Sequence, residues 1–104
     1  MALSSTVIGT TNTTIISGTS GQLRAVICLF LCNTNTSTAD SVTIYAVANG
    51  QSASDTNTII KSTEIDSTDT LTFDTEKLLL GDGDSIQGVS SNGTISATIS
   101  YTDV

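Results

Sequence analysis

The sequence contains no histidine, no proline and no tryptophan, and only three of its side chains are cationic. Without histidine, the chain can build neither a Ser-His-Asp triad nor a histidine-ligated zinc site. The three cations, Arg24, Lys61 and Lys77, can neutralise very few nucleic-acid phosphates, and the net charge of −7 repels DNA, RNA and anionic lipid. These absences exclude histidine-dependent hydrolase sites and argue against nucleic-acid and membrane partners.

Charged and aromatic residues are scarce as well, at 12% and 4% of the 104 positions, whereas 20 Thr and 15 Ser give a third of the chain a small hydroxyl group. Disordered chains combine few apolar residues with high net charge, but here the apolar residues are clustered and periodic. The length is typical of a single domain, 1–104. Because the core of such a domain is small, we expect a marginally stable monomer that gains stability from partners.

No targeting segment is apparent. Residues 1–9 are uncharged and lack the basic region and the long apolar region of a signal peptide. The longest apolar run, residues 25–32, has eight residues, well short of the ~20 that a membrane-spanning helix needs. We therefore expect a soluble protein that is made in a cytoplasm.

Short β-strands separated by turn residues are the dominant pattern. We expect no helix of substantial length and about eight strands, packed as an antiparallel two-sheet β-sandwich or jelly roll. The segment 58–65 is compatible with either a strand or one helical turn. The expected strands are residues 7–8, 13–17, 23–32, 41–47, 58–65, 70–74, 85–89 and 95–102, with a further short apolar run at 78–80.

The segment 23–32 is the strongest of these, because both of its alternating faces are apolar. This predicts a central strand covered on both sides, with Phe30 pointing inward, as we also expect for Phe73. Asn92-Gly93 is the best hairpin signal in the chain. In the strand after it, Ile95, Ala97, Ile99 and Tyr101 should point inward, and the Ser and Thr residues between them outward. Because proline is absent, the sheet edges must be protected by charge, by loops or by pairing with other subunits.

The two cysteines, Cys28 and Cys32, have C-x-x-x-C spacing. Four residues apart on a strand, they lie on the same face at a separation of about 13 Å. A disulfide requires Cα atoms within about 7 Å, and a shared metal ion fails for the same reason. We therefore interpret them as free, buried thiols, with an intermolecular or redox role as the alternative.

Asp82-Gly83-Asp84 could belong to a calcium loop, but the oxygen ligands and the Glu of an EF-hand do not follow it. A tight turn explains the sequence equally well. The alternative is a weak cation site that Asp66, Asp69 or a neighbouring subunit completes.

A second acidic group comprises Asp66, Asp69, Asp74 and Glu76. Paired carboxylates can hydrolyse glycosides, but sugar sites usually need aromatic platforms as well, and this chain has only four aromatic residues. We interpret the group as solvated loop charge. We assign no catalytic, cofactor-binding or metal-ligating residue, and we expect no enzymatic activity and no cofactor.

From residue 26 onward, the order of features resembles a family of small virion structural proteins of tailed bacteriophages, in particular cyanophage and marine phage members. That family combines an "LLCNT" strand end, a "GDTL" turn, an "LxLxxGDxI" segment and an "xVSYxxV" final strand. The corresponding stretches here are Leu31–Thr34, Thr68–Leu71, Leu80–Ile86 and Ile99–Val104. Thr68 occupies the position of the Gly in the family's turn.

The resemblance implies a β-sandwich present in many copies in a virion assembled in the host cytoplasm. The role it favours is a capsid decoration (cement) protein that stabilises the head by binding the major capsid protein. A neck, tail or fibre component is the first alternative, and a carbohydrate- or receptor-binding module is the alternative of another class. We expect a homo-oligomer, with a trimer suiting quasi-threefold capsid positions, no nucleic-acid or membrane contact, and an extended N-terminal arm at residues 1–12.

Overall fold

The computed structural model describes residues 2–73 and 78–104, and nearly all of their regular structure is β-strand. One sheet contains β1 (Ala2–Ile8), β3 (Arg24–Asn33), β6 (Thr70–Phe73), β7 (Leu78–Leu80) and β9 (Ile95–Asp103). The other contains β2 (Thr13–Ser17), β4 (Asp40–Val47), β5 (Thr58–Ile65) and β8 (Ser85–Ser90). A single 3₁₀ turn, η1 (Asp55–Asn57), precedes β5. The segment 58–65 is thus a strand and not a helical turn.

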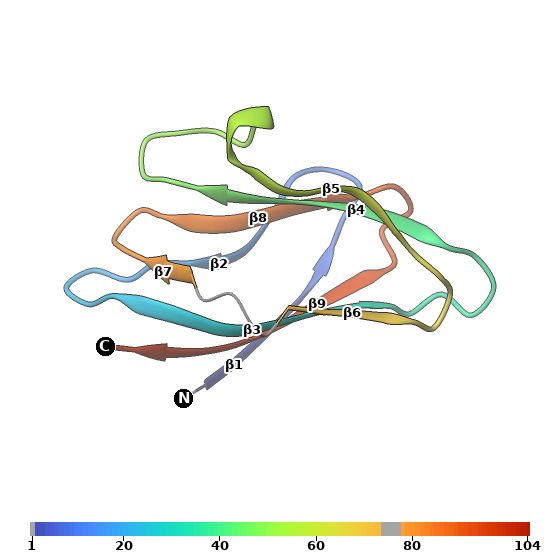
Figure 1. Ribbon diagram of the computed structural model, residues 1–104, viewed down its shortest axis with the longest axis horizontal. Coiled ribbons are helices and arrows are strands. Elements are labelled where there is room, and N and C mark those ends of the chain that lie inside the picture. The colour runs from blue at the N-terminus through green and yellow to red at the C-terminus, as the bar shows by residue number, and fades with distance from the viewer. Residues whose placement is uncertain (1, 74–77) are drawn as a thin grey trace.

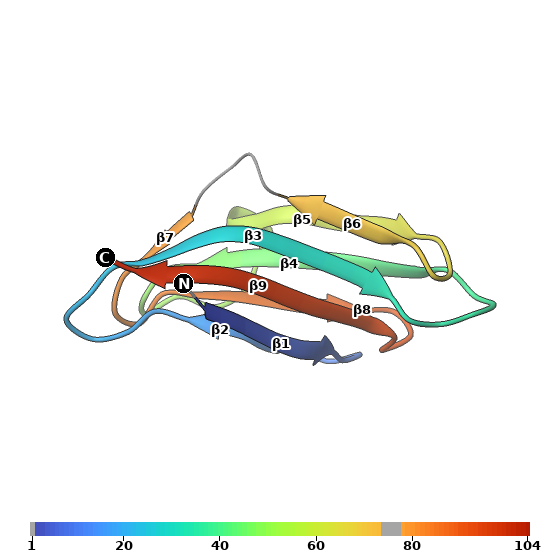
Figure 2. The same ribbon diagram turned by 90° about the horizontal axis from the view of Figure 1, so that it is seen from below.

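The two sheets pack face to face as an antiparallel sandwich, as the sequence predicted (Figures 1 and 2). The strand orders are β1-β9-β3-β6 and β2-β8-β4-β5, and β7 pairs with the same edge of β3 as β6 does. If β6 and β7 are counted as one interrupted edge strand, this is the strand order of a jelly roll. Nearly every connection therefore crosses from one sheet to the other.

Aliphatic side chains from both inner faces form the core. Ile95, Ala97 and Ile99 of β9 are fully buried, and Tyr101 packs against the core, so the predicted inward face of this strand is confirmed. The intervening Ser and Thr residues are only partly covered. The remaining core residues come from β1, β2, β3, β4, β5, β7 and β8: Ile8, Ile15, Ile16, Val26, Leu29, Leu31, Val42, Ile44, Ile65, Leu80 and Ile86.

A β-bulge in β3 corrects the prediction for this strand. Val26 pairs with Tyr101 and Cys28 with Ser100, so Ile27 is an extra residue that reverses the alternation of side chains. After the bulge Leu29 and Leu31 are buried, whereas Phe30 points outward and is 38% exposed. The strand is central within its sheet but is not covered on both sides by the described chain. The expectation that Phe30 points inward is wrong, because simple alternation cannot anticipate an inserted residue.

The N-terminal segment is part of the sandwich. The structure places residues 2–8 in β1, which pairs with β9 at every position from Ala2↔Tyr101 to Ile8↔Ile95. Within the extended arm expected at residues 1–12, residues 2–8 are thus an edge strand whose backbone groups pair with β9. Ile8 at the end of the strand is completely buried, which fixes the strand against the core.

Asn92-Gly93 makes a turn, but not a hairpin. β8 pairs with β2 and β4, whereas β9 pairs with β1 and β3, so this turn carries the chain between the sheets. The turn itself is as predicted, since Gly93 has φ of 74° and its N–H donates to Ser90 Oγ. The prediction of a hairpin was wrong because the turn does not decide which strands pair.

A buried polar network closes this end of the sandwich. Asp40 is only 2% exposed and accepts hydrogen bonds from the backbone N–H groups of Asn92 (2.9 Å) and Thr94 (3.1 Å). The Thr94 hydroxyl lies 3.0 Å from Asp40 Oδ2 and 2.9 Å from Asn33 Oδ1, so these two acceptors compete for one proton. Fully buried Asn33 donates in turn to the carbonyls of Thr38 and Ile65. The network connects β3, β4, β5 and the β8–β9 turn.

Candidate interaction surface

The uncovered face of the five-stranded sheet is the most unusual surface of the described chain. The strand registers place its side chains in rows across β1, β9, β3 and β6, such as Ser5–Thr98–Phe30–Thr72. We call this surface the outer face. Its members are Leu3, Ser5 and Val7 of β1, Ser96, Thr98, Ser100 and Thr102 of β9, Ala25, Cys28, Phe30 and Cys32 of β3, Thr70 and Thr72 of β6, and Leu79 of β7.

Large apolar side chains are concentrated on this face. Leu3 is 72% exposed, Val7 61% and Leu79 60%, in addition to Phe30. Leu23 and Val104 extend the β3–β9 ladder by two reciprocal backbone hydrogen bonds of 3.2 and 2.7 Å. By strand alternation their exposed side chains point to the same side. Of the exposed large hydrophobic residues in the described chain, only Ile59 lies elsewhere.

None of the outer-face residues is charged, although the chain carries a net charge of −7. The charged pair nearest to it, Arg24 and Asp103, belongs by alternation to the opposite side of the sheet. Arg24 Nε donates to Asp103 Oδ1 at 2.8 Å, its Nη1 donates to the carbonyl of Ser17, and its guanidinium lies 4.5 Å from the centre of the Tyr101 ring. The hydrogen bond from Arg24 lowers the pKa of Asp103. This pair joins the two sheets and leaves the outer face uncharged.

Cys28 and Cys32 lie on the outer face as free, half-buried thiols. That both are free agrees with the prediction from their spacing, and their incomplete burial corrects the expectation that they are buried. They pair with Ser100 and Ser96, respectively, in the β3–β9 ladder.

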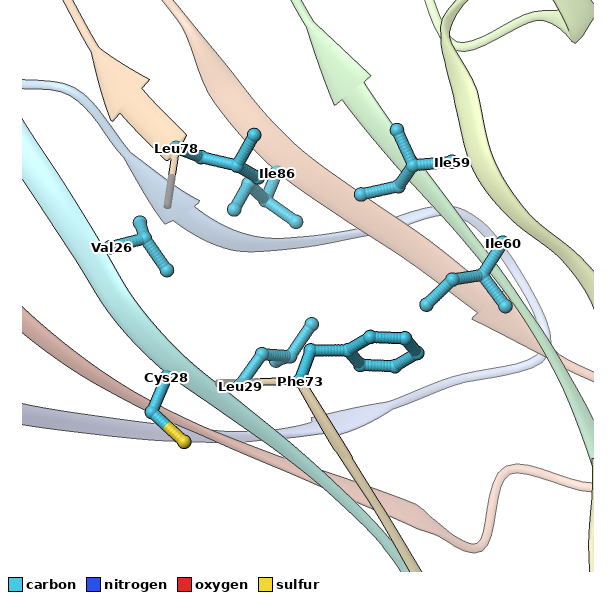
Figure 3. A pocket seen from close by; sticks show the side chains of 8 residues that line it. All are labelled: Val26, Cys28, Leu29, Ile59, Ile60, Phe73, Leu78 and Ile86. Atoms are coloured by element: carbon cyan, nitrogen blue, oxygen red, sulfur yellow. The ribbon is translucent and has the colours of Figure 1, made fainter. Parts of the chain in front are cut away.

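An apolar pocket of about 300 Å³ opens between the sheets beside β3. Figure 3 shows aliphatic side chains and Phe73 around this space, with the sulfur of Cys28 pointing away from them. Among the described residues, its lining contains no acidic, basic or amide side chain. Its lining residues are Val26, Cys28, Leu29, Ile59, Ile60, Phe73, Leu78 and Ile86.

The acidic candidates are separated by the fold. Asp84 accepts the backbone N–H groups of Gly81 and Asn49, each at 2.9 Å, and these bonds lower its pKa. Asp84 therefore stabilises the β7–β8 turn, which agrees with the interpretation of Asp82-Gly83-Asp84 as a tight turn. Asp66 and Asp69 lie in the β5–β6 turn at the opposite end of the sandwich (Figure 1), so they cannot complete a cation site with Asp82 and Asp84 of the same chain.

Two members of the second acidic group, Asp66 and Asp69, lie in a described turn. Asp69 Oδ1 accepts the N–H of Thr70, and the Asp69 N–H donates to the carbonyl of Asp66, so these residues shape the turn. Asp74 and Glu76 lie outside the described residues. Within residues 2–73 and 78–104, no three His, Cys, Asp or Glu side chains are grouped so that they could hold a metal ion.

The sequence suggested that apolar or Thr-rich sheet faces and residues 1–9 make contacts, but it did not identify which residues form the outer face. Its N-terminal part could have been found, because Leu3, Ser5 and Val7 would share one face of a strand if residues 2–8 were extended. The remaining part depends on the bulge at Ile27, which brings Cys28, Phe30 and Cys32 to the same side as the Ser and Thr residues of β9. No local pattern marks that bulge.

Comparison with protein-family models, with curated proteins and with solved structures found no match. In the described ranges, no helix has the length and apolar character needed to cross a bilayer.

Proposed function

We propose that this chain is an accessory structural protein of a tailed bacteriophage virion, and specifically a capsid decoration protein that stabilises the head. The resemblance of residues 26–104 to small phage structural proteins suggests the class. The observation that carries the proposal is the outer face, a broad sheet surface that combines exposed Leu, Val and Phe side chains with Ser and Thr and has no charged residue. A jelly-roll fold agrees with a capsid role by analogy only.

The physical argument concerns desolvation. Contiguous exposed apolar surface marks interaction sites in soluble proteins, and the centres of protein interfaces are depleted of charged residues because burying an unpaired charge is costly. Ser and Thr hydroxyls can hydrogen-bond either to water or to a partner's backbone, so they suit a surface that becomes buried on assembly. The outer face has exposed apolar side chains on β1, β3 and β7, a row of Ser and Thr on β9 between β1 and β3, and no charged member.

The mechanism of a decoration protein requires no chemistry. Each copy would cover the boundary between neighbouring capsid subunits, and its binding to the assembled shell but not to separated subunits would stabilise the shell by mass action. Exposed carboxylates outside this face, those of Asp55, Glu64, Asp66, Asp69 and Asp82, disfavour contact with packaged DNA. The partner is therefore the outside of the major capsid protein lattice.

The direct test is quantitative mass spectrometry of purified particles. A decoration protein is expected at hundreds of copies per head, whereas about 3–18 copies are expected on the tail axis, which would identify a neck, tail or fibre component. Absence of the chain from particles would end the virion proposal. Binding to a glycan array would then support the alternative of a carbohydrate- or receptor-binding module.

A paired substitution tests the role of the outer face. Phe30→Glu places a charge in the centre of the face, and we expect it to abolish binding to particles that lack the chain. Ile59→Glu changes an exposed apolar residue outside this face and should leave binding intact. Equal binding by both variants would show that the outer face is not the docking surface.

A further inference from the structure

The four sheet edges of this sandwich are protected to very different degrees. β2 has only five residues and a register shift between Thr14 and Ile16. β5 has two register shifts, carries Lys61 and contains Ser62 at φ of 47°. β6 and β7 have four and three residues. Short strands, bulges and lysine are established ways in which proteins prevent edge-to-edge pairing.

The edge formed by β1 has none of these protections. It runs for seven residues, pairs with β9 in an unbroken register and contains no charged residue. Among the described strands, none pairs with its other side, and Figure 2 shows it at the margin of the sheet beyond β9. Its outward N–H and C=O groups are therefore free to pair with a strand from another molecule.

We propose that β1 pairs antiparallel with β1 of a second copy across a twofold axis, so that two five-stranded sheets become one continuous sheet. The sequence of β1 is complementary to itself in the register that pairs all seven residues. In this register Ser5 lies opposite Ser5, and Leu3 lies opposite Val7 of the other copy. Leu3 and Val7 are both largely exposed in the monomer and lie on the same face. The twofold axis therefore creates two Leu3–Val7 contacts in each dimer, and both bury apolar side chains that are exposed in the monomer.

The absence of charged residues on β1 permits a second copy as the occupant. Two molecules with a net charge of −7 repel each other on approach, and an uncharged edge continuous with an uncharged face minimises that repulsion. A basic partner, in contrast, would find no carboxylate on β1. The pairing would form about six to eight backbone hydrogen bonds. A stable dimer normally buries about 1,200–2,000 Å², so one strand pair predicts an association that depends on concentration.

The β1 dimer does not depend on the virion proposal, and it differs from the trimer that would suit quasi-threefold capsid positions. Twofold pairing of β1 with itself is closed, because it uses the free edge of both copies. It produces a dimer with a doubled outer face.

Sedimentation equilibrium of the purified chain at increasing concentration is the primary test. We expect the mass to rise from 10.7 kDa to twice that value. The double variant Leu3→Glu, Val7→Glu places like charges opposite each other and should remain monomeric. The double variant Leu3→Lys, Val7→Glu changes the same two positions but opposes unlike charges, and should dimerise again. Leu79→Glu, on the same face but at the other edge, should dimerise like the wild type.

A cross-link tests the register. In a background where Cys28 and Cys32 are replaced by Ser, Ser5→Cys should form an intermolecular disulfide on oxidation, because the two side chains face each other across the axis. Thr98→Cys, one strand further in, should not. A wild-type monomer or trimer, failure of the Lys–Glu variant to restore the dimer, or equal cross-linking at both positions would overturn the proposal.

Discussion

Replacing Asp40 by Asn removes a negative charge while keeping nearly the same shape. The Asp40 carboxylate faces only donors: Asn92 N–H at Oδ1, and Thr94 N–H and hydroxyl at Oδ2. An amide offers one oxygen and one NH₂ group. Whichever way it is oriented, its NH₂ group meets a backbone N–H that then has no acceptor.

The size of the effect can be estimated from these contacts. An unsatisfied buried donor costs about 1–3 kcal/mol, and the remaining bonds lose the extra strength of a charged acceptor, about 0.5–1 kcal/mol. We therefore expect Asp40→Asn to reduce the free energy of unfolding by about 2–4 kcal/mol. For a domain of this size the midpoint of thermal unfolding should fall by about 10–20 °C.

The pH dependence has a definite sign. Burial acts to raise the pKa of Asp40 and is the largest single influence, but the hydrogen bonds from Thr94 and Asn92 together outweigh it and lower the pKa below its ordinary value of 3.8. A carboxyl with a lowered pKa stabilises the folded state above its unfolded pKa, and this stabilisation is lost as the pH falls through the folded value. Below about pH 4 the wild type should lose stability more steeply than Asp40→Asn.

Urea unfolding monitored by circular dichroism, repeated from pH 3 to pH 7, measures both effects. Asp82→Asn is the matched control, because Asp82 is exposed and the same charge is removed without disturbing the network. Surface substitutions usually change the free energy of unfolding by no more than about 0.5 kcal/mol. If the free energies of unfolding of Asp40→Asn and Asp82→Asn agree within that range, the reasoning about the buried network is refuted.

Three further outcomes are expected. Thr68→Gly should stabilise the chain by about 0.5–1 kcal/mol, because exposed Thr68 has φ of 63°, where a β-branched residue is strained; lower stability in urea would contradict this. Gly18→Ala should greatly reduce the yield of folded protein, because a Cβ there would overlap the carbonyl of Gly81. At Gly21 a Cβ would meet open space, so Gly21→Ala should reduce the free energy of unfolding by only about 1 kcal/mol. Similar thermal midpoints for the two variants would refute the packing argument. Mild oxidation should leave Cys28 and Cys32 unlinked within one chain, and an intramolecular disulfide in a peptide mass map would show that β3 is not extended between them.

Most strands, and the local phase of β9, could be predicted because they depend on neighbours in sequence. Alternation in residues 95–101 identified the buried face of β9, and the turn residues around Asn92 and Asp84 marked true turns. The bulge at Ile27 could not be predicted, since it is fixed by how β3 matches β9 along the whole ladder. The residues of the outer face could not be assigned for the same reason, because they come from five strands spread over the sequence.

By itself, the sequence determined an all-β chain with a small aliphatic core, few charges and no histidine chemistry, because composition and a period of two act locally. Only the tertiary structure decided that the Asn92-Gly93 turn crosses between sheets, that residues 2–8 form an edge strand instead of an arm, and that Asp40 is buried among backbone donors. Strand partners and burial are chosen by long-range packing of the whole chain, which minimises exposed apolar surface and unpaired backbone groups together.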